Sequence, residues 1–383
     1  MTGPEARDAH GAPEAATAAL RAEHSFAAIR ASRLYSVRHH LYGRRRWWLW
    51  RSYETLWPLA DAWSATATLA STGNEPATAA LAEVVVALAA YHRDRAALGG
   101  SGPVGFESCV VPPLGGGGDV YYDDNAWVGL ALVRHHDLTG DERALTLAER
   151  IFSFVTSGWS TEASWSRPGG IRWKQPSSNV SRNTCSNGPV AELAALVHLR
   201  TGSTEALEWA VRIYDWVRAA LLGDDGLYLD RIAPDGRRDP TRWTYNQGTM
   251  IGAAVLLHRI TGEAAYLEHA IQTAEASLGR YGPSELAHNG AAFNAVFFRN
   301  LLLLDEVSQD PARLRLASDY GDRLWGESRD PRTGLFGGTG SPLNNSAPMV
   351  EVYALVAGAA PHPSAPPAAG DAAPAPPGKT RLV

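Results

Sequence analysis

The sequence predicts an all-α protein in which six helical hairpins close into a ring. Apolar residues recur at three- and four-residue spacing along most of the chain, the pattern of amphipathic helices. A Thr-Gly dipeptide recurs at separations of 67, 62 and 60 residues, and each glycine suits the left-handed end of a helix. Each repeat therefore contains one hairpin, and ring closure lets every hairpin bury its faces on its neighbours. The copies are Thr72-Gly73, Thr139-Gly140, Thr201-Gly202 and Thr261-Gly262.

Twelve helices follow from the apolar stripes, taken in chain order. The eleventh starts at Asp310-Pro311, because proline suits the first turn of a helix. An open solenoid of the same hairpins is the competing architecture, but solenoids usually repeat in shorter units. We expect the helices at residues 14–35, 54–70, 75–94, 124–138, 142–157, 185–201, 204–221, 245–260, 263–279, 290–307, 311–326 and 345–358.

Long segments separate the hairpins, and they are rich in Trp, Gly, Asn and Asp. Because each segment follows the second helix of a hairpin, a ring would bring all of them to one end. Long loops in a compact domain usually carry function, so we expect the site at that end. The segments are residues 95–123, 158–184, 222–244, 280–290 and 327–344.

The two ends of the chain are expected to lie outside the ring. Residues 1–13 and 360–383 are rich in Ala, Pro and Gly and cannot bury a core, so we expect both to be disordered. Residues 14–359 would then form a single domain.

Composition excludes several classes of protein. A formal net charge of −5 gives no general attraction to nucleic acid or to an anionic membrane. The two cysteines, Cys109 and Cys185, exclude a disulfide scaffold and a Cys-rich zinc module, although one disulfide between them stays open. The sequence starts without a signal-like segment and has no long apolar run, so we expect a cytoplasmic protein without membrane contact. We also expect a monomer that uses no metal or cofactor.

The most distinctive segment is residues 115–127, in which four glycines precede Tyr-Tyr-Asp-Asp-Asn-Ala-Trp. Asp123 and Asp124 stand at an expected helix start, where a carboxylate can simply cap the helix. Their aromatic neighbours and their place at the end of a long loop favour catalysis instead. Cleavage of a glycosidic bond needs two carboxyl groups in unlike environments, and neighbours on a helix can face one site from different directions. We therefore predict that these two residues are a catalytic pair.

The segment YYDDNAW resembles the signature of the family 76 glycoside hydrolases, the endo-α-1,6-mannanases. Further stretches match in the family's order, and the resemblance covers roughly residues 40–358. It implies an (α/α)6 barrel, in agreement with the hairpin count. It also implies retaining, double-displacement hydrolysis of α-mannosidic linkages, of the α-1,6 type, with Asp123 as nucleophile and Asp124 as acid/base. The other stretches are GGIRWK (169–174), NTCSNGPVAELAA (183–195), GLYLDRI (226–232), WTYNQGTMIGAAVLLHRITGEAAYLEHA (243–270) and FNAVFFRNLLLL (293–304).

The resemblance further implies a groove that binds a manno-oligosaccharide or mannoside. Asp230 matches an acidic residue on the substrate face, and other motif positions line the groove. Two structural interpretations stay open: the asparagines could cap helices, and Trp243 and Tyr245 could pack inside the ring. The groove residues are Tyr122, Trp127, Trp173, Asn183, Asn187, Asp230, Trp243, Tyr245, Asn246 and Gln247.

Two features depart from the family's pattern. The secreted members carry an export signal, which does not precede the motifs here, and residues 38–51 are unusually basic and rich in Trp. The tryptophans could line the site, whereas the arginines could bind an anionic group or form a solvated loop. Both departures leave a smaller intracellular glycoside open as the substrate. The residues concerned are Trp47, Trp48 and Trp50, and Arg44, Arg45 and Arg46.

A non-hydrolytic carbohydrate-binding barrel and a sugar epimerase are alternative functions of the same architecture. The intact carboxyl pair argues against the first, and the lack of a prominent loop histidine argues against the second. The glycines are not followed by the Gly-Lys-Ser/Thr of a P-loop, and no zinc motif occurs. We interpret Cys185, close to the predicted site, as a small buried residue.

Overall fold

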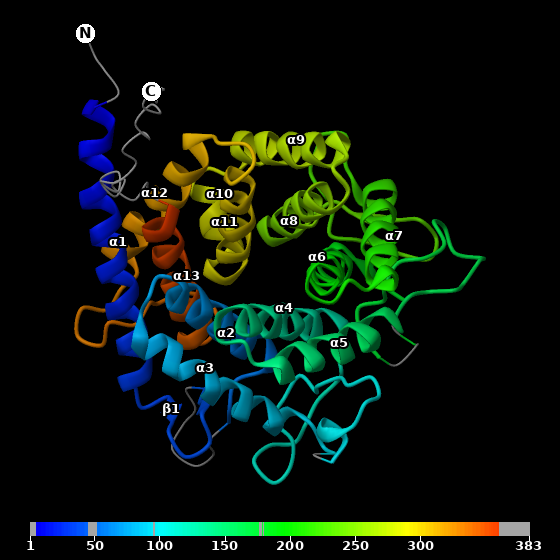
Figure 1. The fold of residues 1–383 in the computed structure, drawn as a ribbon, viewed down its shortest axis with the longest axis horizontal. Helices are drawn as coiled ribbons and strands as arrows, with labels where there is room; N and C mark the ends of the chain where they lie inside the picture. Colours follow the sequence, from blue (N-terminus) through cyan, green and yellow to red (C-terminus); the bar gives the residue numbers. More distant parts are fainter. Residues whose placement is uncertain (1–4, 45–51, 95, 176–177, 179, 360–383) are drawn as a thin grey trace, which may run out of the picture.

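The computed structural model describes residues 5–44, 52–94, 96–175, 178 and 180–359, with residues 5–13 described by their backbone. The helices form two layers around a common axis (Figure 1). The inner layer consists of α2 (Leu56–Ser71), α4 (Tyr122–Thr139), α6 (Thr184–Thr201), α8 (Thr244–Thr261), α11 (Ala291–Asp305) and α13 (Pro342–Ala359). The outer layer consists of α1 (Glu5–Ala31), α3 (Glu75–Leu88), α5 (Glu142–Thr156), α7 (Thr204–Leu221), α9 (Ala264–Arg280) and α12 (Pro311–Glu327).

Contacts between the inner helices close the ring. Each inner helix packs against the next in chain order, and α13 packs against α2. Five hairpins consist of consecutive helices, whereas the sixth joins the two ends of the chain, because α1 packs against α13. The predicted ring of six hairpins, an (α/α)6 barrel, is therefore confirmed, and the open solenoid is excluded.

The two layers differ in burial as their positions require. Helix α6 is buried at every position from Thr184 to Ala195, because an inner helix contacts neighbours on all sides. An outer helix buries only the stripe that faces the inner layer. In α7 this stripe consists of Ala206, Ala210, Ile213, Tyr214, Val217, Ala220 and Leu221.

The expected helices are present with small shifts of their ends, and three differences are larger. Helix α1 begins at Glu5 rather than at residue 14, so part of the segment expected to be disordered is helical. The helix expected over 75–94 ends at Leu88 and continues as the short 3₁₀ turn η1 (Ala89–Tyr91). The segment 280–290, expected as a loop, contains α10 (Pro283–Asn289). The expectation for residues 360–383 lies outside the described residues.

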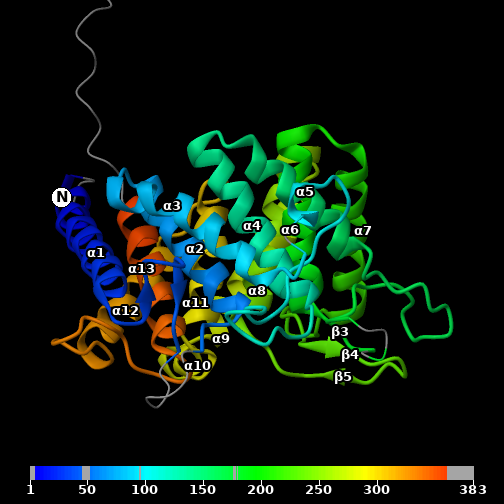
Figure 2. The same cartoon turned by 90° about the horizontal axis from the view of Figure 1, so that it is seen from below.

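The segments between hairpins lie at one end of the ring, as predicted, and Figure 2 shows α10 and the β3–β5 sheet together there. Short strands within them were not predicted, because two-residue strands carry no period. Strands β1 (Tyr35–Ser36) and β2 (Leu41–Tyr42) form an antiparallel pair. Strands β3 (Arg182–Asn183), β4 (Arg231–Ile232) and β5 (Arg238–Asp239) form an antiparallel sheet in that order, and η2 covers Ala97–Gly99.

The Thr-Gly repeat forms the turns at the opposite end. Gly140, Gly202 and Gly262 end their helices in the left-handed region, with φ of 70°, 73° and 74°. A histidine stands four residues before each glycine, and its ring faces the backbone oxygen of the residue that follows the glycine. His198 Nδ1, for example, lies 2.9 Å from the Ser203 oxygen. The full motif is therefore His-x-x-Thr-Gly, and its histidine was not recognised from the sequence.

We expect His198→Ala to lower the free energy of unfolding by about 1 kcal/mol, because a half-buried hydrogen bond is lost while the glycine cap remains. Urea unfolding followed by circular dichroism measures this change. The matched control is His24→Ala, at an exposed position on α1, which should change stability by less than about 0.5 kcal/mol. Equal effects of the two substitutions would contradict the role of His198 in the turn.

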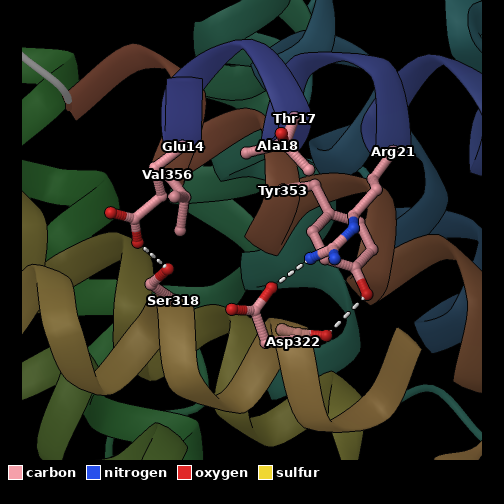
Figure 3. Close-up of a pocket in the computed structure, with 9 residues that line it drawn as sticks. Glu14, Thr17, Ala18, Arg21, Ser318, Asp322, Tyr353 and Val356 are labelled. Atoms are coloured by element: carbon pink, nitrogen blue, oxygen red, sulfur yellow. Dashed lines mark hydrogen bonds and ion pairs between the residues drawn. The ribbon is translucent and has the colours of Figure 1, made fainter. Parts of the chain in front are cut away.

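Polar contacts hold the closing hairpin together. A crevice of about 270 Å³ lies where α1 packs over α12 and α13, and Figure 3 shows the side chains that line it. Arg21 forms an ion pair with Asp322, and the Tyr353 hydroxyl donates to the Gly321 oxygen at 2.8 Å. This crevice belongs to the outer layer and is bridged by contacts that join the two chain ends, so we assign it a structural role.

Within the described ranges, no helix combines the length and the apolarity needed to cross a bilayer. In the same part of the chain, no group of three or more His, Cys, Asp or Glu side chains is placed to hold a metal ion.

Candidate active site

The first turns of the inner helices face the loop end of the ring, and they carry most of the predicted site residues. Because the outer helices run from the Thr-Gly turns back to the loop end, every inner helix starts at that same end. The ring thus brings together residues that are far apart in sequence. From these first turns come Trp57 of α2, Asp123 and Asp124 of α4, Cys185 and Asn187 of α6, Tyr245, Asn246 and Gln247 of α8, and Phe293 of α11.

Asp123 is held by three hydrogen-bond donors. Its Oδ1 accepts the backbone N–H of Asp124 at 2.9 Å. Its Oδ2 accepts the indole N–H of Trp173 at 2.8 Å and the thiol of Cys185 at 3.4 Å. Burial raises the pKa of Asp123 to about 6, and the donors act against burial because they favour the anion. Simple capping does not account for this arrangement, since the N-cap residue of α4 is Tyr121.

Asp124 stands in a different environment. Burial and the negative charge of Asp123 raise the pKa of Asp124 well above its ordinary value. Among the described residues, its carboxyl lacks the side-chain donors that Asp123 has. Two neighbouring carboxyls with unlike surroundings share a proton unequally, so the anion is favoured on Asp123 and the proton on Asp124. The two carboxyl groups therefore differ in the way that the predicted roles of nucleophile and acid require.

Trp173 reaches Asp123 from the loop over 158–184. Its backbone is tied to the start of α4, because Trp173 accepts the backbone N–H of Tyr122 at 3.0 Å. Tyr121 and Trp173 also contact each other through their rings, with centroids 4.9 Å apart. Tyr121, which the sequence analysis did not select, thus lies on the site side. Tyr122, which it did select, is 3% exposed and stacks on Phe154 between α4 and α5.

Fully buried amides fasten the loops to the inner helices. They occupy the fourth position of α4, α6 and α8, and each binds both the N–H and the C=O of one loop residue at 2.7–3.0 Å. Two of them, Asn187 and Gln247, were predicted to line the groove, but the loop backbone occupies their amides. The pairs are Asn125 with Phe106, Asn187 with Ile171 and Gln247 with Tyr228.

A second polar group lies beside Cys185. Burial, followed by the charge of Asp239, raises the pKa of Asp230 to about 6. The amide of Asn246 favours the Asp230 anion, although the two do not reach normal hydrogen-bond geometry. Both amide atoms of the fully buried Asn246 lack a hydrogen-bond partner within the described part of the chain. Because buried polar groups normally find partners, Asn246 and Asp230 can accept a hydroxyl-bearing ligand.

Aromatic rings form a belt next to the carboxyl pair. Trp57 meets Trp127 edge-on at 5.2 Å between ring centroids and Tyr245 at 6.4 Å. Phe293 contacts Tyr245 at 4.0 Å and Trp243 at 5.5 Å. Trp57 and Trp243 are half-buried, whereas Trp127 and Tyr245 are buried. The belt can therefore offer the ring faces of Trp57 and Trp243 to a sugar. The buried rings of Trp127 and Tyr245 serve mainly to pack the core.

Two further predictions concern Trp243 and Asn183. Trp243 stacks on His288 of α10, with an interplanar angle of 7° and centroids 5.9 Å apart, so the unpredicted α10 supports it. Asn183 precedes α6 but makes no capping bond with its side chain. Its side-chain Oδ1 instead accepts the Ser181 hydroxyl at 2.5 Å, so the capping interpretation does not hold for this residue.

The basic, Trp-rich segment over 38–51 is described only in part. Arg44 lies 3.3 Å from the carboxylate of Glu54, a buried residue, so the protein itself supplies an anionic partner for this arginine. The expectations for Arg45, Arg46, Trp47, Trp48 and Trp50 fall outside the described residues.

A cavity of about 1290 Å³ lies at the opposite end of the ring. It is lined by Thr72, Gly73, Arg134, Asp137 and other residues of the helix ends. At about 1.5 Å per residue, Asp137 is roughly 20 Å from Asp124 along α4. Neither catalytic candidate lines this cavity, so its volume is separate from the candidate site.

Sequence comparisons match part of the chain to known hydrolases. The family model described as glycosyl hydrolase family 76 matches residues 111–308, just over half of the chain. The chain is 29% identical over 206 residues to mannan endo-1,6-alpha-mannosidase DCW1 of Candida glabrata, a match that covers 49% of this chain and 41% of that protein. It is 29% identical over 160 residues to the protein of the same name from Saccharomyces cerevisiae, covering 37% and 34%. The chain thus spans less than half the length of these curated relatives.

Structural comparisons match nearly the whole ring. The glycoside hydrolase family 76 (mannosidase) Bt3792 from Bacteroides thetaiotaomicron has a TM-score of 0.75 and 23% identity, covering 89% of this chain and 98% of that chain. An inactive variant of the alpha-1,6-mannanase GH76A of Salegentibacter sp., in complex with alpha-1,6-mannotetrose, has a TM-score of 0.74 and 22% identity, covering 89% and 99%. These likenesses establish the fold of the chain.

Proposed function

Because the chain belongs to glycosyl hydrolase family 76, we propose that it hydrolyses α-mannosidic linkages, of the α-1,6 type, in a manno-oligosaccharide or mannoside. The observation that carries the proposal is the adjacent pair Asp123 and Asp124, held in unlike environments at the loop end of the ring. The matched relatives, which are named mannan endo-1,6-alpha-mannosidases, support the linkage.

The proposed reaction is a double displacement with retention of configuration. In the first step the Asp123 carboxylate attacks the anomeric carbon, the glycosidic bond breaks, and Asp124 gives its proton to the leaving oxygen. In the second step Asp124 takes a proton from water, the water oxygen attacks the anomeric carbon, and the Asp123 carboxylate leaves. Two inversions restore the original configuration. The donors around Asp123 and the raised pKa of Asp124 suit these roles.

Substrate contacts are assigned by exposure and by free hydrogen-bonding capacity. We propose that sugar rings stack on Trp57 and Trp243, while Asp230 and Asn246 bind hydroxyl groups. Asn183 and Tyr245 are also buried, and we propose that they hold these groups in place. Tyr122, Trp127, Asn187 and Gln247 are proposed to support the groove from behind, because they are buried and engaged with loops or core.

The proposed roles imply a bell-shaped dependence of kcat/KM on pH. Activity falls at low pH because protonation of Asp123, whose pKa is raised to about 6, removes the nucleophile. Activity falls at high pH because Asp124 loses the proton that the leaving group needs. The two limbs belong to the coupled pair rather than to either residue alone.

A product assay tests the function. The protein is incubated with α-1,6-mannan, α-1,6-manno-oligosaccharides and aryl α-mannosides, and proton NMR follows the first anomer released. We expect cleavage of the α-1,6-linked substrates with the α-anomer appearing before mutarotation. Release of the β-anomer would overturn retention, and binding of manno-oligosaccharides without any product would indicate the non-hydrolytic barrel. Cleavage of small aryl mannosides alone would favour a smaller glycoside as the substrate.

Cellular location and oligomeric state stay predictions. A cytoplasmic monomer is proposed from the sequence pattern, and cell fractionation with light scattering of the purified protein tests both parts.

A further inference from the structure

The nucleophile proposed above is bound unequally at its two oxygens. Oδ2 of Asp123 accepts two side-chain donors, Trp173 at 2.8 Å and Cys185 at 3.4 Å. Oδ1 accepts one backbone donor, the N–H of Asp124 at 2.9 Å. A carboxylate has about four lone-pair sites, two on each oxygen. Both sites of Oδ2 are therefore engaged, and one site of Oδ1 remains.

We propose that Trp173 and Cys185 are positioning residues that hold Oδ2 of Asp123 and leave Oδ1 as the atom that attacks the sugar. This inference rests on the proposed function and adds to it the orientation of the nucleophile. Trp173 and Cys185 act through Asp123 rather than on the substrate.

The two donors are fixed to the same helix. Cys185 stands in the first turn of α6 and is 5% exposed. Asn187, two residues further on, binds the N–H and C=O of Ile171 at 2.7 and 3.0 Å. Ile171 is two residues before Trp173, so α6 holds the loop that carries the indole. A clamp whose two donors share one rigid support fixes the carboxylate plane more precisely than a flexible loop could.

Cys185 remains a donor throughout the working pH range. Burial and the nearby charge of Asp123 raise the pKa of the Cys185 thiol well above its ordinary value. The residue therefore stays a thiol, and a thiol can donate a hydrogen bond to a carboxylate. This also argues against a nucleophilic role, since a nucleophilic cysteine needs a lowered pKa.

The clamp has a defined part in both chemical steps. In the first step a lone pair of Oδ1 forms the bond to the anomeric carbon, and the electron pair of the glycosidic bond goes to the leaving oxygen, which takes the proton of Asp124. Oδ2 becomes the carbonyl oxygen of the ester and keeps both donors. In the second step the bond between Oδ1 and the anomeric carbon breaks with its electron pair. The donors on Oδ2 then stabilise the departing carboxylate.

The test compares Cys185→Ala with Cys185→Ser in the whole protein, with kcat/KM for an aryl α-1,6-mannobioside measured across pH. Loss of the donor in Cys185→Ala is expected to lower kcat about tenfold and to leave KM within about twofold. The acid limb, which is the fall of kcat/KM at low pH, should move to higher pH by roughly half a unit, because the Asp123 anion has lost a donor. Cys185→Ser restores a donor and should return the acid limb towards the wild-type position.

Cys109→Ala is the matched control. Cys109 is the other free cysteine and stands half-buried in the loop before α4. Its replacement should leave the acid limb and kcat unchanged. Thermal unfolding of all variants separates a loss of fold from a loss of positioning.

The outcomes separate the two proposals. If the wild-type protein cleaves no mannoside, the proposed function is wrong. If it does, and folded Cys185→Ala keeps the wild-type acid limb and kcat, the clamp is overturned. If Cys185→Ala shifts the acid limb and Cys185→Ser does not reverse that shift, the effect arises from packing. This outcome would also overturn the clamp. Trp173→Phe, which removes the stronger donor, should move the same limb further.

Discussion

Asp123→Asn and Asp124→Asn are each expected to lower kcat on an α-1,6-manno-oligosaccharide by at least about 10³-fold, while the ring stays folded. An amide at position 123 cannot form the ester intermediate, and an amide at position 124 can neither protonate the leaving oxygen nor activate water. The carboxyl environments predict that the two variants fail in different ways.

Activated substrates distinguish the two failures. A dinitrophenyl α-mannobioside needs no proton for departure, so Asp124→Asn should still form the ester with Asp123. Added azide should then attack this ester and give an α-configured glycosyl azide. Asp123→Asn should give no such product. If the two variants exchanged these behaviours, the assignment of nucleophile and acid would be reversed.

A control carboxylate separates catalysis from general effects of charge. Asp322 forms an ion pair with Arg21 in the outer-layer crevice. Asp322→Asn should keep kcat within about twofold of wild type, because it stands outside the site. Near-wild-type turnover in either variant of the catalytic pair would contradict the assignment of that residue.

Asp123→Asn should also stabilise the fold at neutral pH. The folded-state pKa of Asp123, about 6, lies above the ordinary value of 3.8, so the folded protein binds more protons than the unfolded chain between these values. Stability contributed by this group is therefore present at low pH and lost as pH rises through about 6. At pH 7.5, Asp123→Asn should raise the free energy of unfolding by about 3 kcal/mol, and below about pH 3 the difference should vanish.

The repeat explains why the fold was predictable from one sequence. Amphipathic stripes and the left-handed glycines Gly140, Gly202 and Gly262 are local signals, and local signals specify helices and turns. Ring closure follows from them because every hairpin needs two neighbours. The short α10 was missed since seven residues are too few for a period, and its effect, support of Trp243 by His288, is visible only in three dimensions.

The candidate site was predictable to a lesser degree. The carboxyl pair has a sequence signature, but the distinction between groove and support has none. Asparagine and glutamine often bind sugars, and Asn187 and Gln247 therefore looked like groove residues. Their side-chain amides instead form hydrogen bonds with the backbone of buried loop residues. Cys185 gave no signal because its partner, Asp123, is 62 residues away in sequence. Trp57 could have been found by aligning the first turns of the inner helices.

Arg299→Met is expected to destabilise the protein by about 3 kcal/mol, the lower end of the typical cost of breaking a buried ion pair, because the buried carboxylate loses its closest partner and keeps only weaker ones. Arg299 of α11 lies 2.9 Å from Glu351 of α13, and the two side chains are 7% and 2% exposed. Arg134 of α4 is a weaker partner at 3.5 Å, and the Ser64 hydroxyl donates to the same carboxylate at 3.0 Å. Three inner helices besides α13 therefore converge on one buried carboxylate.

This ionic cluster lies between the two ends of the ring. Arg299 lines the cavity at the Thr-Gly end, and its charge also acts on the buried Asp61, which in turn feels the charge of Asp124. Burial raises the pKa of Asp61 well above its ordinary value, and Glu351 adds to the rise while Arg299 opposes it. Loss of Arg299 is thus expected to affect both the inner packing and the electrostatics beneath the catalytic pair.

Chemical denaturation of Arg299→Met, Glu351→Met and the double variant measures the coupling. Replacement of both charges by apolar side chains should recover much of the stability lost in Arg299→Met, because the fully buried Glu351 carboxylate is removed with its closest partner and the remaining Arg134 is partly exposed. The control is Arg143→Ala, whose exposed pair with Asp141 lies at the start of α5 and whose loss should leave the free energy of unfolding nearly unchanged. Additive losses in the double variant would show that Arg299 and Glu351 stabilise the ring independently, and the cluster would then be packing rather than a buried ion pair.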